Sequence, residues 1–202
     1  MLWRLSKALQ RGSYYASHQQ SRWVSTLSAP QTKTYHLQAV SSGSCCVSST
    51  ESGHAVTSDL PRVSGGSDTA AEPVYLLLAA LCGCEAATAQ FVAYKMKISL
   101  GDIRFKLEAT RDQRGALSLP LGSDIPVPSR LQLVTGTAMV ESDATDTQLA
   151  ELEREVHVRC PVANMLVASG AVLDVRFERE PAQRSNISSK SSVEDICLKA
   201  LI

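Results

Sequence analysis

Acidic residues are absent from the first 50 positions of the chain, because neither Asp nor Glu occurs before Glu51. The same segment carries five Lys and Arg residues, so the zero formal net charge of the 202-residue chain hides a basic start and an acidic remainder. The balanced total gives no reason to expect a nucleic-acid partner, since such proteins gather an excess of basic side chains. A continuous apolar stretch is also missing at the start, which argues against a secretory signal peptide.

Residues 1–30 have the composition of a mitochondrial transit peptide. Three Leu residues between positions 2 and 9 fall on one helical face, and the nearby Arg and Lys residues fall mostly elsewhere. An amphipathic, acid-poor start that contains Arg and Ser is typical of such targeting segments. We therefore expect import into the mitochondrial matrix and removal of this segment. A disordered basic tail is the alternative.

Cysteine patterns that would bind a metal are missing as well. The chain has six cysteines: Cys45, Cys46, Cys82, Cys84, Cys160 and Cys197. The Cys45-Cys46 pair lacks the two-residue gap of a zinc knuckle, and no paired His motif follows it. We expect no metal or other cofactor. Since no secretory signal is visible, reduced thiols are expected in place of a structural disulfide framework.

Strands are predicted where apolar and polar residues alternate. They fall at residues 34–40, 103–110, 131–141 and 173–178, with a possible return strand near 55–58. One-sided alternation favours antiparallel sheets that have one face in water.

Two consecutive helices are predicted between the last two strands. Thr145 and Gln148 have the spacing of a capping box that opens the first helix. The second helix is predicted to start at Pro161 and to end before Gly170. The order of strands, long helix, strands, helix pair and strand indicates one α+β domain. It spans residues 34–181, and a Ser-rich tail follows at residues 182–202.

The long helix is predicted from Pro73 to Lys97. Its segment Leu76 to Cys84 is apolar on every side but is too short to span a membrane, and Glu85 interrupts it. A helix that is apolar all round must be buried on all sides. One small domain cannot easily cover a helix of this length, so we expect a homodimer.

Two of the cysteines are candidates for chemistry. Cys160 precedes Pro161, so it is placed at the N-cap of a helix, where the helix dipole would lower its thiol pKa toward neutrality. His157 and Arg159 could add to that effect, and simple space filling is the alternative. Cys84 lies in the middle of the apolar helix, where burial raises a thiol pKa. Taken alone, Cys84 is explained better by a structural role.

The residues around both cysteines resemble a known family. The stretch GGSDTAAEPVYLLLAALCGCEAATAQFVAYK resembles the first signature of the OsmC/Ohr family, thiol-dependent organic hydroperoxide reductases. In that signature a Gly-Gly loop and a proline precede an apolar helix, whose reactive Cys stands eleven residues after the proline, as Cys84 stands after Pro73. The later stretches RDQRGALSLP, VESDATDTQLAELE and CPVANML resemble further family blocks, of which the last holds a second reactive Cys. The resemblance runs from about Tyr35 to Glu180.

The resemblance implies a fold, an assembly and a mechanism. The fold has antiparallel sheets wrapped around a long central helix in an intertwined homodimer. Cys84 matches the peroxidatic Cys, which attacks an alkyl or lipid hydroperoxide and becomes a sulfenic acid. Cys160 matches the resolving Cys, which condenses with it to a disulfide that an external lipoyl or other thiol reductant opens. The helix-dipole argument makes Cys160 the more acidic thiol, whereas the family has the first Cys, here Cys84, attack the hydroperoxide. We follow the family on this order.

The chain departs from the family at the position of an activating carboxylate. Many members have a Glu one or two residues after the helix-opening proline, where this chain has Val74 and Tyr75. Arg62 is the nearest match to the activating Arg of some members, and a solvated loop Arg is its alternative interpretation. Three functions therefore stay open: a thiol peroxidase, a redox-responsive binding or regulatory dimer, and a catalytically silent homologue.

Overall fold

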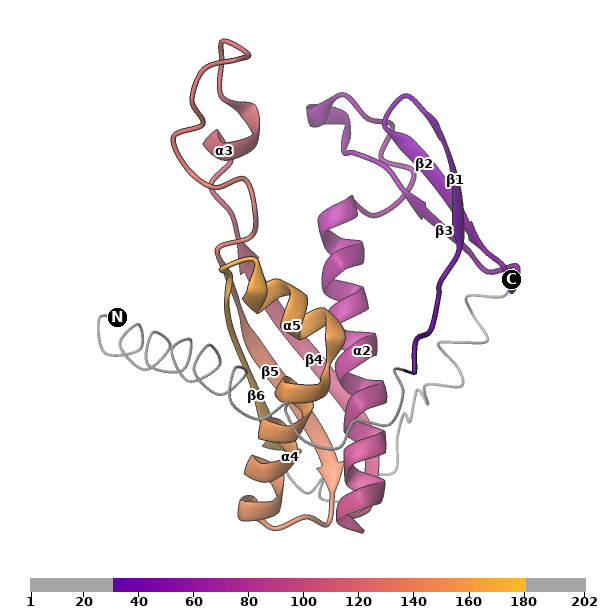
Figure 1. Cartoon of the computed structure of the whole chain (residues 1–202), viewed down its shortest axis with the longest axis vertical. Helices are drawn as coiled ribbons and strands as arrows, with labels where there is room; N and C mark the ends of the chain where they lie inside the picture. The colour runs from indigo at the N-terminus through magenta and orange to yellow at the C-terminus, as the bar shows by residue number, and fades with distance from the viewer. Residues whose placement is uncertain (1–30, 181–202) are drawn as a thin grey trace, which may run out of the picture.

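The computed structural model describes residues 31–180, so the predicted transit peptide and Ser-rich tail lie outside the described residues (Figure 1). The elements in chain order are β1 (Leu37–Ser42), β2 (Cys45–Thr50), β3 (Ala55–Ser58), the 3-10 turn η1 (Arg62–Ser64), α2 (Pro73–Met96), β4 (Leu100–Thr110), α3 (Arg114–Leu117), β5 (Leu133–Ser142), α4 (Asp146–Arg159), α5 (Pro161–Ala168) and β6 (Val172–Arg179). The predicted α+β class and the order of the long helix and the helix pair are confirmed.

The first sheet is an antiparallel meander, β1-β2-β3. Its middle strand was not predicted, because the sequence CCVSST carries no clear apolar alternation; the strand expected near residues 55–58 is the third. The prediction that the first strand is half-buried is wrong for the single chain. Every residue of β1 is exposed, including Leu37 at 63% and Val40 at 77%. An exposed apolar sheet of this kind needs a further surface to cover it.

Asp59 organises the loop between this sheet and the long helix. The buried Asp59 carboxylate accepts hydrogen bonds from the Ser44 and Thr69 hydroxyls and from the backbone N–H groups of Leu60, Ser67 and Thr69. These bonds, led by the one from Ser44, hold the Asp59 pKa well below its usual range. A Cβ at Gly66 would meet the Leu60 carbonyl oxygen at 1.9 Å, so the loop requires a glycine there.

Helix α2 follows the predicted bounds closely. It opens with Pro73 in its first turn and ends at Met96, and the C-cap residue Lys97 has a left-handed backbone. The expectation that it is buried on all sides fails within one chain. Its exposed apolar side chains include Tyr75 at 63%, Phe91 at 53% and Tyr94 at 77%. By length and composition alone, α2 is also apolar enough to cross a membrane, and little of its most apolar stretch is buried within one chain.

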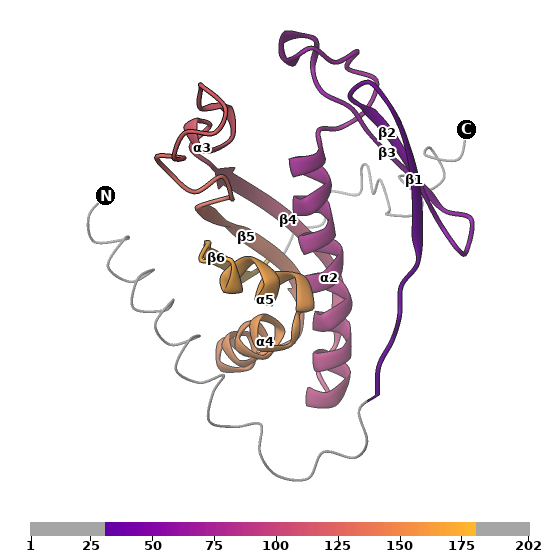
Figure 2. The ribbon, with the colours of Figure 1, turned by 45° about the horizontal axis from the view of Figure 1, so that its top comes forward.

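The second sheet packs against α2 through β4. Figures 1 and 2 show α2 between the two sheets, with α4 and α5 beside it. In this sheet β4 pairs antiparallel with β5, while β5 pairs parallel with β6. The prediction of antiparallel pairing is therefore wrong for β6. The α4–α5 helix pair carries the chain back to the end of the sheet where β5 begins, which is the connection that a parallel pair requires.

The helix pair is built as its sequence predicts. The Thr145 hydroxyl accepts a hydrogen bond from the backbone N–H of Gln148, and the Gln148 side chain accepts one from the Thr145 N–H. This capping box opens α4. Gly170, at φ 88°, follows the end of α5. Apolar side chains of α2, α4, β5 and β6 form the main core, and a second buried cluster joins α2, α5 and β5.

Candidate functional site

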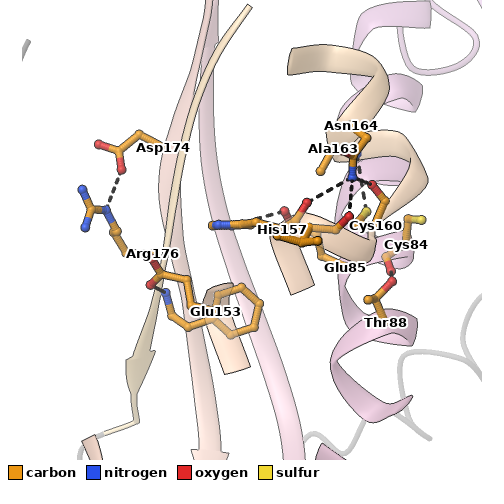
Figure 3. Close-up of polar contacts among 12 residues, drawn as sticks. Cys84, Glu85, Thr88, Glu153, His157, Cys160, Ala163, Asn164, Asp174 and Arg176 are labelled. Carbon is orange, nitrogen blue, oxygen red and sulfur yellow. Dashed lines mark hydrogen bonds and ion pairs between the residues drawn. The ribbon is translucent and has the colours of Figure 1, made fainter. Parts of the chain in front are cut away.

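The structure brings Cys84 and Cys160 into contact, although 76 sequence positions separate them. Cys84 is half-buried in the middle of α2, and Cys160 is fully buried at the junction of α4 and α5. Cys160 belongs to the second buried cluster and Cys84 packs against it, close enough for the Cys84 thiol to raise the pKa of Cys160 (Figure 3). Neither is in a disulfide. A disulfide between them requires Cα atoms within about 7 Å of one another, or a local movement of the backbone that brings them to that distance.

Cys160 caps α5 as the sequence predicts. Its sulfur accepts a hydrogen bond from the Ala163 backbone N–H at 3.4 Å. The Asn164 side chain holds the same junction, because its amide donates to the carbonyl oxygens of Cys160, Val158 and His157 at 2.8, 3.1 and 3.1 Å. These bonds fix the backbone on both sides of Cys160.

The expected lowering of the Cys160 pKa is wrong. Burial is the largest influence on this thiol, and together with the Cys84 thiol and the Glu85 charge it raises the pKa of Cys160 to about 12. The Ala163 N–H acts in the opposite direction but is weaker. Arg159 does not help, because its guanidinium is exposed and bonds the Glu155 carboxylate at 2.7 Å.

A buried carboxylate beside the thiols was missed as a site residue. Glu85, next to Cys84 on α2, has no solvent exposure, and within residues 31–180 neither of its carboxyl oxygens has a hydrogen-bond partner. Its Oε1 lies 3.7 Å from Nε2 of His157, which α4 directs toward it (Figure 3). Burial and then the charge of Glu153 raise the Glu85 pKa from an ordinary 4.5 to about 7. The sequence signal was a single acid inside an apolar run, which we used only to argue against a membrane span.

Arg62 is not part of this group within one chain. It lies on the exposed turn η1, above the start of α2 and next to the first sheet (Figure 1). Val74 is half-buried and packs against the second buried cluster, while the Tyr75 side chain is exposed. The structure therefore leaves the family's Arg and Glu positions without counterparts at the thiols of the same chain.

A pocket of about 550 Å³ lies along the first turns of α2 and the end of β4. Its lining residues are Glu72, Val74, Tyr75, Leu78, Leu107, Glu108, Ala109, Thr110, Arg111, Gln113 and Leu131. Several of the apolar ones, among them Val74, Leu78 and Leu131, also belong to or pack against the cluster that contains Cys160. The pocket thus combines apolar side chains with charged groups from Glu72, Glu108 and Arg111, and neither Cys84 nor Cys160 is among its lining residues. Across the described part of the chain, no three His, Cys, Asp or Glu side chains are grouped as a metal site.

The comparison with protein families decides the classification. The family described as OsmC-like protein matches residues 65–176, more than half of the chain and both cysteines. The chain belongs to the OsmC-like family. A search of curated proteins finds no significant match.

Solved structures share the fold of this OsmC-like protein. An OsmC-like protein from Mycoplasma pneumoniae has a TM-score of 0.61 at 21% identity, and the match covers 75% of this chain and all of that one. A protein from Legionella pneumophila described as organic hydroperoxide resistance protein OsmC has a TM-score of 0.51 at 20% identity, with 75% and 100% covered. A putative organic hydroperoxide resistance protein from Vibrio cholerae, with captopril in one of its active sites, has a TM-score of 0.53 at 20% identity, with 76% and 95% covered. At such low sequence identity, the structural similarity shows a common fold.

Proposed function

We propose that this OsmC-like protein is a thiol peroxidase that reduces alkyl or lipid hydroperoxides through Cys84 and Cys160. The observation that carries the proposal is the contact between the two thiols, which come from different helices. The Cys84 thiolate attacks the terminal hydroperoxide oxygen, the O–O bond breaks, and the alcohol leaves with a proton. The resulting Cys84 sulfenic acid condenses with the Cys160 thiol, so that a disulfide and water form. An external dithiol then reduces the disulfide and is itself oxidised.

The pocket along the first turns of α2, which shares Val74, Leu78 and Leu131 with the cluster around Cys160, supports an organic substrate over hydrogen peroxide. Its apolar side chains, including Leu78 and Leu131, suit an alkyl or acyl chain, and its polar rim suits the oxygen-bearing end. The structures from Legionella pneumophila and Vibrio cholerae that share the fold are described as organic hydroperoxide resistance proteins.

A homodimer is part of the proposal. One chain exposes apolar side chains on the first sheet and on α2, among them Val40, Phe91 and Tyr94. A second copy that covers these surfaces would bury them, and the same contact accounts for the apolar length of α2 without a membrane. Light scattering of residues 31–202 should give twice the chain mass, and a well-folded monomer would contradict this part.

A regulatory or catalytically silent dimer is the second candidate. It is favoured by the electrostatics of Cys160, since the groups that shift its pKa are Cys84, Glu85 and the Ala163 N–H, none of which is a cation. A thiol without a nearby cation forms little thiolate. Such a protein would form the disulfide slowly and would use it as a signal.

Peroxide consumption separates the two candidates. The purified protein is mixed with cumene hydroperoxide or a fatty-acid hydroperoxide, with dihydrolipoamide or glutathione as reductant. Turnover with a dithiol, together with a Cys84–Cys160 disulfide found by peptide mass mapping, supports the peroxidase. Oxidation of Cys84 no faster than that of a free thiol supports the alternative. Location in the mitochondrial matrix is a separate proposal, and diffuse cytosolic signal from a reporter fused to residues 1–30 would refute it.

A further inference from the structure

The disulfide-forming step presents a chemical difficulty at Cys160. This thiol must lose its proton to attack the oxidised sulfur of Cys84, yet its pKa is raised to about 12. At pH 7 a thiol with that pKa is ionised in roughly one molecule in 100,000. A nearby base that accepts the proton as the sulfur attacks would remove this obstacle.

Glu85 is a buried acid whose ion-pair partner among residues 31–180 is His157, 3.7 Å away. Its side chain is completely buried, and within residues 31–180 neither carboxyl oxygen takes part in a hydrogen bond. Burying a carboxyl group in this way is costly, and structural carboxylates such as Asp59 are surrounded by donors. An amide or an apolar side chain would fill the same space at lower cost. A buried acid beside two thiols therefore points to a role in proton transfer.

The titratable groups around Glu85 come from each helix packed against it. They are Cys82 and Cys84 on α2, Glu153 and His157 on α4, and Cys160 at the start of α5. Glu153 is held by the backbone N–H of Phe177, which donates to its Oε2 at 3.0 Å, and its charge acts on Glu85. Figure 3 shows the Glu85 and His157 side chains directed toward one another with Cys160 beside them.

We propose that Glu85 is the proton acceptor for Cys160 when the disulfide forms. The inference rests on the proposed dithiol function. The Cys160 sulfur attacks the Cys84 sulfur while its proton passes to the Glu85 carboxylate; the S–S bond forms, the S–O bond of the sulfenic acid breaks, and the leaving hydroxide takes a solvent proton to become water. When the external dithiol opens the disulfide, Cys160 leaves and recovers the proton held by Glu85.

The test isolates the Cys160 step from peroxide chemistry. A variant that keeps Cys84 and Cys160 as its only cysteines is mixed with 5,5′-dithiobis(2-nitrobenzoate). Attack by Cys84 releases one coloured thiolate and leaves a mixed disulfide. Attack by Cys160 on that mixed disulfide then releases a second thiolate. The first release serves as an internal reference, and the rate of the second is followed from pH 5 to pH 9.

Two matched variants make the test specific. In the parent, which keeps only Cys84 and Cys160, the rate of the second thiolate release should rise with pH and have its midpoint near pH 7, where Glu85 ionises. Glu85→Gln should slow it about 100-fold at pH 8 and remove this midpoint. Glu153→Gln, which removes the neighbouring charge and keeps Glu85, should move the midpoint to lower pH.

Two results would overturn the inference. The first is a rate of the second thiolate release in Glu85→Gln that stays within twofold of the parent and keeps the same pH midpoint. The second applies if Glu85→Gln fails to fold, and it is an unchanged pH midpoint in Glu153→Gln. Failure of the proposed function looks different, because hydroperoxide would then not oxidise Cys84 while both thiolate releases and their dependence on Glu85 remain.

Discussion

Replacing Glu85 with Gln should make the protein relatively more stable as the pH rises. Glu85 is fully buried, and its pKa rises from 4.5 to about 7 on folding. This difference corresponds to about 3 kcal/mol at about 1.4 kcal/mol for each pH unit. Gln keeps the shape of the side chain but does not ionise. It therefore avoids the cost of a buried negative charge at high pH.

The sign follows from proton binding. Between pH 4.5 and about 7 the unfolded chain ionises Glu85 while the folded chain keeps it protonated. The folded state thus binds more protons, and the free energy of unfolding of the wild type falls over this range. The contribution of Glu85 is fully present below pH 4.5 and is lost once the pH exceeds about 7. The Gln variant lacks this loss.

Urea unfolding of the reduced protein at a fixed concentration checks the magnitude. The free energy of unfolding of Glu85→Gln minus that of the wild type should rise by about 3 kcal/mol from pH 4.5 to pH 8. The difference is used because any fixed cost of the Gln amide cancels between the two pH values. Glu51→Gln, in an exposed turn, controls for the removal of one negative charge. A difference that stays constant with pH would refute the reasoning.

Three further outcomes are expected. Replacing Phe91 and Tyr94 together with Glu should shift light scattering from dimer to monomer mass at micromolar concentration, because their exposed rings would carry charge into the proposed interface; an unchanged dimer would place the interface elsewhere. Thr145→Ala should lower the free energy of unfolding by about 1 kcal/mol in urea titrations, since it removes the capping box of α4. Cys84→Ser should abolish peroxide consumption, whereas Cys160→Ser should allow one equivalent of oxidation and leave a sulfenic acid on Cys84 that dimedone labels; rapid turnover by either variant would contradict the dithiol cycle.

The helical half of the fold was predictable because its signals are local. Pro73, the capping box at Thr145 and the glycine after α5 each mark a helix end with residues a few positions apart. The contact between Cys84 and Cys160 is different, since it depends on how α2 packs against α5. The stretches that resemble the OsmC/Ohr family suggested that Cys84 and Cys160 work together, whereas the apolar periodicity of the sequence gave no such indication.

The failures have equally specific causes. The Cys160 pKa was misjudged because the cap geometry is local, whereas the burial that outweighs it comes from α2 and β5. The strand β2 was missed because Ser and Thr occupy the positions where apolar residues would alternate. Glu85 was recognised only as an interruption of an apolar run. Its meaning depends on His157, which lies 72 positions later and reaches it only after α4 packs on α2.

Cys160 is both the C-cap of α4 and the N-cap of α5. A reaction at its sulfur therefore affects the backbone where the two helices meet. In the reduced state this sulfur receives the Ala163 N–H and thereby anchors the first turn of α5. In the proposed disulfide the sulfur would turn toward Cys84 and the Ala163 N–H would lose this acceptor, while the Asn164 amide would still donate to the carbonyl oxygens of His157 and Cys160. We therefore expect oxidation to weaken the first turn of α5 and to leave the end of α4 in place. Backbone hydrogen exchange at the first turn of α5 should then differ between the reduced and the disulfide form of the protein.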